Sequence, residues 1–384
     1  MDFLNAVVGS INDFLWTYII IVVLVGSGLW FTLSTGLVQL RALPEMVRLL
    51  AGDLGRRPSG RKAISSFQAF CVSTASRVGV GNIAGVAIAI VTGGPGAVFW
   101  MWVIAFIGTA TGFVESTLAQ IYKIPRGHGL FHGGPAYYIR NALGQPAVAK
   151  LFAVLISVTF GLIYVSVQAN TIALSMEKAF GIDTYLVGGV LAVLAGAVIF
   201  GGIQRVASFS ALLVPIMAGI YLLIALIIFL MHIDQVPAMF ALILHDAFSP
   251  QAAVGGGIGT AILTGIRRGL FSNEAGEGSI PNAAATANVT HPVKQGLVQA
   301  FGVYVDTWIV CSATAFIVLL TGQYTIGGDT TGIALAQDSL ASVFGPLASS
   351  LLAVLIFLFA FSSVVGNYYY GEINIHFITE NTKP

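Results

Sequence analysis

Two long apolar stretches of this chain are each interrupted by glycine and polar residues that could do chemistry. The first stretch is Ile64–Val91, and its centre reads STASRVGVGN over Ser73–Asn82. The second is Gly255–Gly278, which ends in RRGLFSNEAGEG over Arg267–Gly278. A chain in lipid cannot leave backbone N–H and C=O groups unpaired, so a broken helix persists only where protein or a water-filled cavity shields it. The freed groups can bind a solute, and two such breaks indicate a secondary transporter.

The first break offers short polar side chains beside flexible backbone. Thr74, Ser76 and Asn82 supply side-chain oxygens, while Gly79 and Gly81 free backbone carbonyls. Such oxygens suit a hard monovalent cation, and the N-terminus of a half-helix suits a carboxylate. Close helix packing through small residues is the competing interpretation, but packing needs no amide in mid-membrane. We predict that Thr74, Ser76, Gly79 and Asn82 bind substrate.

The second break carries four charged side chains, Arg267, Arg268, Glu274 and Glu277. Each charge at membrane depth costs roughly 3 kcal/mol or more unless it is paired or wet. A re-entrant cytoplasmic loop with solvated charges, or charges paired for structure, is the alternative. We predict that Gly269–Gly278 lines the same site as the first break. Its predicted substrate-binding residues are Phe271, Asn273 and Gly276.

Further polar side chains lie inside apolar stretches. Glu115 and Asp306 are lone acids, for which structural pairing is the favoured role. Gln168 lies within a long apolar run, where an amide either ties helices together or faces the substrate. Ser362 and Ser363 supply adjacent hydroxyls, although intramembrane serines usually bond to their own helix.

The composition indicates a membrane protein. It has 384 residues, of which 57% are hydrophobic and 9% charged, with a mean hydropathy of +0.89. Soluble domains carry roughly 25% charged residues. The net charge of +1 gives no reason to expect a nucleic-acid partner. Cys71 and Cys311 fall in apolar spans and are expected to be core residues rather than a disulfide.

The sequence contains no nucleophile elbow, P-loop or metal motif, and no histidine pair has metal-ligand spacing on one helix face. We therefore expect neither enzyme activity nor an organic cofactor. The hydropathy pattern predicts an all-α polytopic protein with nine spans. These spans are Trp16–Gly36, Ile64–Val91, Ala97–Ile121, Lys150–Phe180, Tyr185–Phe200, Ser208–Met231, Gly255–Gly278, Val293–Leu320 and Leu347–Gly371.

Basic residues set the orientation of these spans. They gather after span one, after span three and on the matching side of later spans, and the opposite loops hold only Lys178. By the positive-inside rule the basic loops are cytoplasmic and the N-terminus is outside, in a cell (inner) membrane. The basic residues on the cytoplasmic side are Arg41, Arg48, Arg56, Arg57, Arg61, Lys62, Lys123, Arg126, Arg140, Lys150, Arg205, Lys294 and Lys383.

The two broken stretches run in opposite directions across the membrane, which predicts an inverted repeat of five spans. Residues 1–63 form an extra N-terminal helix and a basic loop, and residues 64–232 form the first repeat. Residues 254–384 form a second repeat that is incomplete in this chain, with three spans and a loop helix over Thr331–Phe344. Two more spans would be expected after Pro384.

Several long blocks of the sequence resemble the alanine or glycine:cation symporter family, and the resemblance covers essentially the whole chain. The blocks are GVGNIAGV from Gly79, GPGAVFWMW from Gly94, GLFSNEAGEGS from Gly269, HPVKQGL from His291 and FGVYVDT from Phe301.

This resemblance implies a leucine-transporter-type fold in which an extra helix precedes a five-plus-five core. It also implies symport of small neutral amino acids, alanine and glycine, with sodium. In the wider superfamily, backbone carbonyls at the first break and two adjacent hydroxyls bind sodium, and here those positions match Ala75, Val78, Ser362 and Ser363. Gln168 lies on the core helix that lines the substrate pocket in such folds.

Taken together, the breaks and the resemblance predict a sodium-coupled importer that works by alternating access in the lipid bilayer. A proton-coupled member of the same fold, with Glu115, Glu274 or Asp306 as the proton carrier, is one alternative. A channel or receptor without coupled transport is another.

Overall fold

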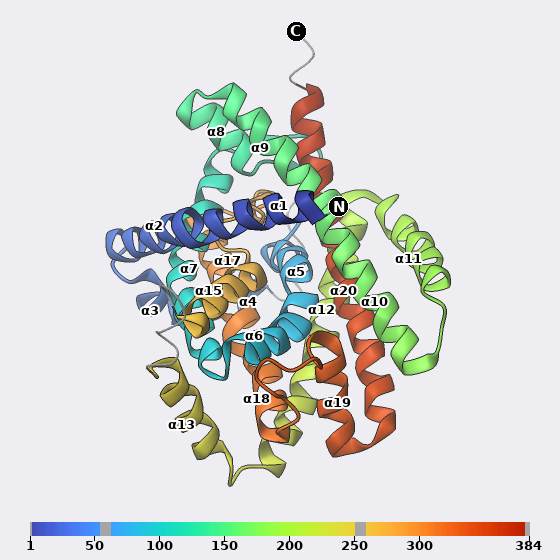
Figure 1. Cartoon of the computed structure of the whole chain (residues 1–384). Helices are drawn as coiled ribbons and strands as arrows, with labels where there is room; N and C mark the ends of the chain where they lie inside the picture. Colours follow the sequence, from blue (N-terminus) through green and yellow to red (C-terminus); the bar gives the residue numbers. More distant parts are fainter. Residues whose placement is uncertain (1, 54–62, 250–258, 381–384) are drawn as a thin grey trace.

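The computed structural model describes residues 2–53, 63–249 and 259–380, and helices make up most of them (Figure 1). The first half contains α1 (Asp2–Phe14), η1 (Leu15–Ile20), α2 (Ile21–Ser34), α3 (Val38–Arg41), α4 (Leu43–Asp53), α5 (Ser66–Arg77), η2 (Gly81–Gly85), α6 (Val86–Gly93), α7 (Gly96–Ile121), β1 (Ile124–Pro125), β2 (Phe131–His132), α8 (Pro135–Leu143), α9 (Pro146–Val158), η3 (Thr159–Tyr164) and α10 (Val165–Phe180). The second half contains α11 (Thr184–Ile199), α12 (Gly202–Met231), α13 (Val236–Ala247), α15 (Thr260–Asn273), α16 (Ile280–Ala284), α17 (Pro292–Val303), η4 (Tyr304–Cys311), α18 (Ser312–Thr321), α19 (Gly332–Phe344) and α20 (Pro346–Glu380). The η segments are π-helical stretches within or beside longer helices.

Long apolar helices confirm a multi-pass membrane protein. Among the described residues, six helices are long and apolar enough to cross a membrane. A seventh candidate is the pair formed by Ser66–Arg77 and Gly81–Gly93, which is bent by 52° at the first predicted break. The six unbroken candidates are Asn5–Ser34, Gly96–Ile121, Pro146–Phe180, Gly202–Met231, Pro292–Thr321 and Pro346–Thr379.

Two of the nine predicted spans are not among these candidates, because their helices are too short. The span predicted over Tyr185–Phe200 is the 16-residue helix α11. Of the span predicted over Gly255–Gly278, residues 260–273 form the helix α15, and residues 255–258 lie outside the described residues. The hydropathy of a segment depends on its composition and not on its hydrogen bonds, so it does not show where a helix ends. Among the basic loop residues, Arg56, Arg57, Arg61, Lys62 and Lys383 also lie outside the described residues.

The loop helix predicted over Thr331–Phe344 is confirmed as α19. Several further helices lie outside the predicted spans and were not predicted from the sequence, namely α1, α3, α4, α8, α13 and α16. The inverted repeat stays a prediction, as do the segments 1–63, 64–232 and 254–384.

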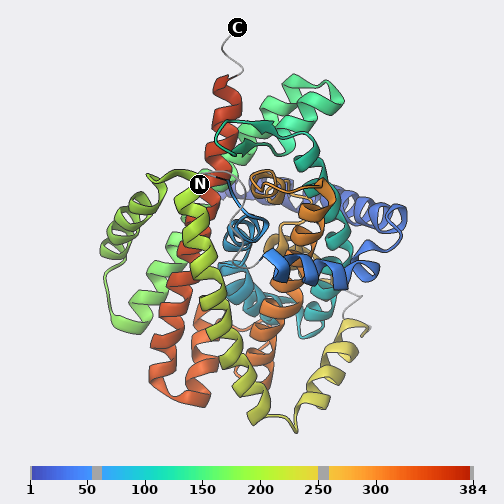
Figure 2. The same cartoon turned by 180° about the vertical axis from the view of Figure 1, so that it is seen from behind.

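Helix α7 organises one half of the core, because α15, α17 and α2 all pack along it. Helix α20 organises the other half, and it runs beside α10 in Figure 1 and beside α12 in the reverse view of Figure 2. Helix α5 contacts both α12 and α20. The first break therefore lies inside the protein, where Ser73–Gly85 are all buried.

Local sequence explains where the helices flanking the breaks begin and end. Ser65 and Gln68 form a reciprocal capping box that starts α5. That helix ends at Val78, whose ψ of 85° leaves the helical region. Helix α15 ends at Glu274, which has a φ of 55°, and the turn continues through Gly276 with a φ of 91°. A left-handed backbone is costly for most residues, so glycine is favoured in this turn.

Candidate functional site

The two breaks meet through Ser76 at the end of α5. Its Oγ lies 3.1 Å from Oε1 of Glu274, at the end of α15, and 2.6 Å from Oδ1 of Asn367 on α20. One hydroxyl has one proton, so it donates to one of these acceptors at a time. The Glu274 carboxylate also accepts a hydrogen bond of 2.6 Å from Ser279. Three helices that are far apart in sequence thus meet at one polar junction.

Asn82 fixes the far side of the first break. Its Oδ1 accepts the N–H of Gly79 at 3.0 Å, and its Nδ2 donates to Oδ1 of Asp306 at 2.7 Å. The other carboxylate oxygen of Asp306 accepts hydrogen bonds from the hydroxyls of Ser272 and Thr307, both at 2.9 Å. Asn82 and Asp306 therefore tie the break to the π-helical stretch η4, within the candidate span Pro292–Thr321.

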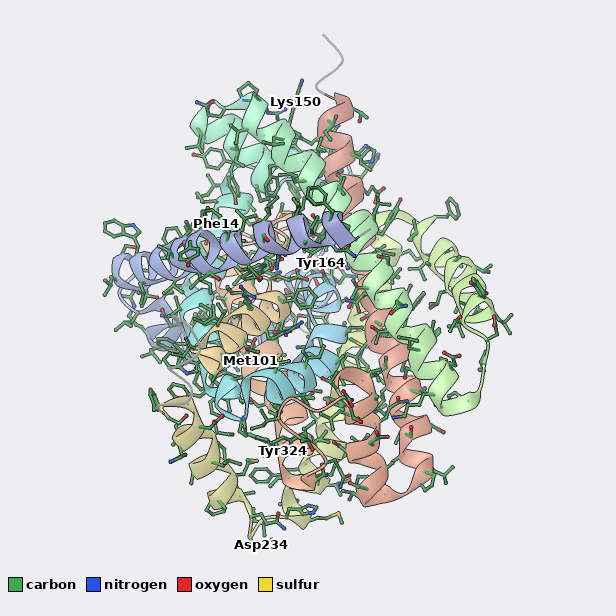
Figure 3. The ribbon with its side chains drawn as sticks, in the orientation of Figure 1. Phe14, Met101, Lys150, Tyr164, Asp234 and Tyr324 are labelled. Atoms are coloured by element: carbon green, nitrogen blue, oxygen red, sulfur yellow. The ribbon has the colours of Figure 1, made fainter. Side chains whose placement is uncertain are left out.

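Gln168 on α10 contacts the same break from the opposite direction. Its Oε1 accepts the backbone N–H of Val80 at 3.2 Å. A Cβ placed on Gly79 would lie 2.9 Å from that oxygen and would also clash with Oγ of Ser363. Phe271 of α15 packs against Gly81 and, edge-on, against Tyr164, with ring centroids 5.4 Å apart. Tyr164 is labelled in Figure 3. The space around the break is narrow.

The hydroxyl pair on α20 lies between a carbonyl oxygen of its own helix, that of Phe359, and the carbonyl oxygen of Ala75 on α5. Oγ of Ser363 lies 2.8 Å from the carbonyl oxygen of Ala75, and Oγ of Ser362 lies 2.7 Å from that of Phe359. The crossed distances are 3.4 Å from Ser362 to Ala75 and 3.2 Å from Ser363 to Phe359. Four oxygens, two from hydroxyls and two from carbonyls, gather where α5 breaks. Val78, the fourth predicted sodium ligand, is the residue at which the helix ends.

Three of the predicted site residues lie outside the contacts described above. Thr74 is buried, and its Oγ1 has no hydrogen-bond partner among the described residues. Asn273 folds back to accept the N–H of Ala275 at 3.0 Å. Gly276 turns toward α7 and α2, where its N–H donates to Glu115 at 3.3 Å and a Cβ would meet Leu24. The structure therefore brings Gly276 to Glu115 rather than to the hydroxyl pair.

Buried charge around the junction is predominantly acidic. Glu115, Glu274 and Asp306 are at most 7% exposed, and the buried guanidinium nearby belongs to Arg77. Among the residues that the structure describes, Arg77 forms only long hydrogen bonds, of 3.4 Å to the carbonyl of Ser73 and 3.5 Å to the side chain of Gln299. Within the described parts of the chain, no ion pair joins Arg77 to these carboxylates. Such an environment favours binding of a cation.

Sequence reasoning missed Asn367 and the carbonyl of Phe359. Both lie on the helix that carries the hydroxyl pair, four residues to either side of Ser363. Positions i, i+4 and i+8 share one face of a helix, so helical periodicity from Ser363 could have found them.

Comparison with known proteins gives a consistent result. A model of the sodium:alanine symporter family matches residues 1–384. The chain is 52% identical over 377 residues to the amino-acid carrier protein AlsT of Bacillus subtilis, covering 98% of this chain and 79% of that protein. It is 50% identical over 380 residues to a protein of the same organism named a probable sodium/glutamine symporter, GlnT, covering 99% and 79%. It is 39% identical over 379 residues to the sodium/alanine symporter AgcS of Methanococcus maripaludis, covering 97% and 83%.

Proposed function

The chain belongs to the sodium:alanine symporter family, and from this premise we propose that it imports alanine and glycine together with sodium. Membership makes it a transporter rather than an enzyme, and amino-acid symport is the activity that its relatives share by name. The choice of ion and amino acid for this chain is the proposal, and it is argued from the contacts around the two breaks.

The observation that carries the sodium part is the cluster of four oxygens from Ser362, Ser363, Ala75 and Phe359. Hydroxyl and carbonyl oxygens are hard ligands that suit small cations. Rotating each hydroxyl turns its proton outward and its lone pairs toward the ion. We include the Val78 carbonyl as a fifth ligand. Because this cluster joins α5 to α20, an ion held there would fix the first break against α20.

The amino acid would lie beside the ion, between the two breaks. Backbone N–H groups at the start of the helical segment Gly81–Gly93, which follows the first break, suit the carboxylate of a zwitterion, since a helix N-terminus favours negative charge. Side-chain oxygens of Gln168, Ser76 and Asn82 suit the ammonium group. Phe271 closes the remaining side. A Cβ on Gly79 already has no room against Ser363 and Gln168, which supports a substrate with a side chain no larger than methyl.

Coupling between sodium and the amino acid would follow because both contact the same helices. Sodium and amino acid would both stabilise one arrangement of α5, α15 and α20, so each raises the affinity for the other by the same factor. Alternating access would then expose the loaded site to one side of the membrane and the other. The N-terminus is placed outside and the basic loops inside in this proposal.

The decisive experiment is uptake of labelled alanine into proteoliposomes that contain the full-length protein. An inward sodium gradient alone should drive accumulation, and glycine should compete. Accumulation driven by a proton gradient without sodium would support the proton-coupled alternative. Flux that equilibrates without regard to either gradient would indicate a channel, and binding without flux a receptor.

One observation favours proton coupling as the second candidate. Glu115, Glu274 and Asp306 are buried around a single guanidinium, that of Arg77, with which none of them forms an ion pair in the described structure. A buried carboxylate without a cation can become neutral by binding a proton. In this candidate Glu274 is the carrier, because its neighbours Ser76 and Ser279 belong to both breaks.

A further inference from the structure

A cavity beside the end of α15 is lined by two arginines. Its volume is about 400 Å³, and it is lined by Asn12, Trp16, Thr92, Thr264, Arg267, Arg268 and Phe271. Four of these residues come from α15 at spacing i, i+3, i+4 and i+7, which places them on one face of that helix. The opposite walls are the end of α6 and the junction of α1 with η1.

The two arginines of this cavity are held differently. Arg267 lies 3.5 Å from the carboxylate of Asp13 and 3.3 Å from the hydroxyl of Thr17, and its guanidinium lies 5.9 Å from the Trp16 ring centroid. Arg268 forms no hydrogen bond or ion pair with any other described residue, although it is only partly exposed. One guanidinium is thus neutralised by its neighbours, and the other is left with open donors.

Phe271 connects this cavity to the proposed transport site. Its ring lines the cavity, and it also packs on Gly81 of the first break and on Tyr164. The same aromatic side chain therefore contacts both the cavity and the first break. An aromatic ring can change rotamer without any movement of the backbone, which makes it a suitable partition between two sites.

We propose that this cavity is an outer binding site that receives the amino acid before it enters the transport site, with Arg268 holding the carboxylate. The inference rests on the proposed function only in taking an amino acid as the ligand. A guanidinium with free donors binds a carboxylate through two parallel hydrogen bonds. The rings of Trp16 and Phe271 offer π faces to the ammonium group, and Thr92 and Thr264 offer hydroxyls.

The first test is kinetic. Arg268→Gln should raise the KM for sodium-dependent alanine uptake about tenfold, as expected for a lost charged hydrogen bond, and leave kcat unchanged. Arg268→Lys should raise the KM less than Arg268→Gln does, because lysine keeps the positive charge but cannot form two parallel hydrogen bonds with a carboxylate. Arg205→Gln is the matched control, because Arg205 lies on α12 and bonds to the carbonyl of Ala197. Unchanged KM in Arg268→Gln, or an equal change in Arg205→Gln, would overturn the proposal.

The second test does not depend on transport. The purified full-length protein is treated with phenylglyoxal, which modifies arginine, and the modification of Arg268 is quantified by peptide mass spectrometry. Propionate, a carboxylate without an ammonium group, should protect Arg268, while ethylamine should not. Lack of protection by propionate would overturn the outer site even if sodium-driven uptake is observed. Protection without sodium-driven uptake would support the cavity and refute the proposed function.

Discussion

The hydroxyl of Ser76 lies 3.1 Å from the carboxylate of Glu274, across 198 residues of sequence. Each residue lies at the end of the helix that precedes a break, α5 for Ser76 and α15 for Glu274. Asn367 joins the same junction from α20 at 2.6 Å. Any movement that separates the two broken segments must break this contact.

We therefore expect Ser76→Ala and Glu274→Gln to be coupled in their effect on uptake. Each single substitution should weaken sodium-dependent alanine uptake, and the double variant should be less impaired than the sum of the two. The coupling energy should be about 1–3 kcal/mol, as for neighbours in one buried network. The uptake kinetics of the wild type, the two single variants and the double variant give this coupling energy. Ser10→Ala, at an exposed serine of α1, is the control, and strict additivity would contradict the expectation.

The hydroxyl pair predicts a sodium phenotype. Ser362→Ala and Ser363→Ala should each raise the sodium concentration for half-maximal uptake several-fold, because one lost oxygen ligand costs about 1–2 kcal/mol. Alanine binding at saturating sodium should change much less. Sodium titrations of alanine uptake distinguish the two effects.

The matched control for this pair is Ser157→Ala, because Ser157 lies on α9 and bonds to the carbonyl of Ala153. An unchanged sodium titration for both Ser362→Ala and Ser363→Ala would remove them from the ion site.

Gly79 predicts a steric phenotype. Its missing side chain leaves space that Ser363 and Gln168 fill, so Gly79→Ala should distort the first break and abolish uptake. Gly85 lies six residues further along the same broken segment, and a Cβ there would meet nothing within 4 Å. Gly85→Ala should therefore transport normally. Equal activity of the two variants, measured with equal amounts of protein in the membrane, would contradict the narrow break.

Substrate size is predicted by the same narrow geometry. Glycine should compete with labelled alanine in the presence of sodium, and leucine should not, because its side chain would overlap Phe271 or the residues around Gly79. Serine should be rejected less sharply than leucine, since one small group in a pocket is worth only about 1–3 kcal/mol. If leucine competes as well as glycine, the pocket is wider than proposed. The name of the relative GlnT makes glutamine a necessary further competitor.

Lys123, which follows the span of α7, predicts a pH effect on stability. Its ammonium group donates to the carbonyl of Ala287 at 2.6 Å and to Gln120 at 2.7 Å. Burial lowers the pKa of Lys123 from 10.5 to about 8. Between these values the unfolded chain binds more protons than the folded protein, so this residue makes stability rise with pH from 8 to 10.5.

Thermal unfolding in detergent at pH 8 and at pH 10 tests the effect. Lys123→Arg is the informative variant, because arginine keeps a donor for Ala287 but does not titrate in this range. The wild-type protein should gain more thermal stability between the two pH values than this variant does. The same gain in both proteins would show that Lys123 is not responsible.

The features that lie within one segment of the chain could be predicted from the sequence. The apolar runs identified the long helices, because every backbone group in lipid must be satisfied within its own helix. Glycine and polar residues located both breaks, at Val78 and Glu274, since the local backbone itself cannot continue as a helix there. The adjacent serines at 362 and 363 were visible because two hydroxyls stand side by side in an apolar run. These features depend on residues that are close in the chain.

Contacts between segments were decided only by the tertiary structure. Ser76 and Glu274 were both candidates, but nothing in either segment indicates that they bond to each other and to Asn367. Gly276 was predicted to bind substrate, and the contact of its N–H with Glu115 of α7 at 3.3 Å could not be foreseen from either segment. Arg267 and Arg268 are indistinguishable as neighbours in sequence, and both line one cavity, yet among the described residues only Arg267 meets Asp13. Helical periodicity says which residues share a face, but the partner of each face depends on how all the helices pack together.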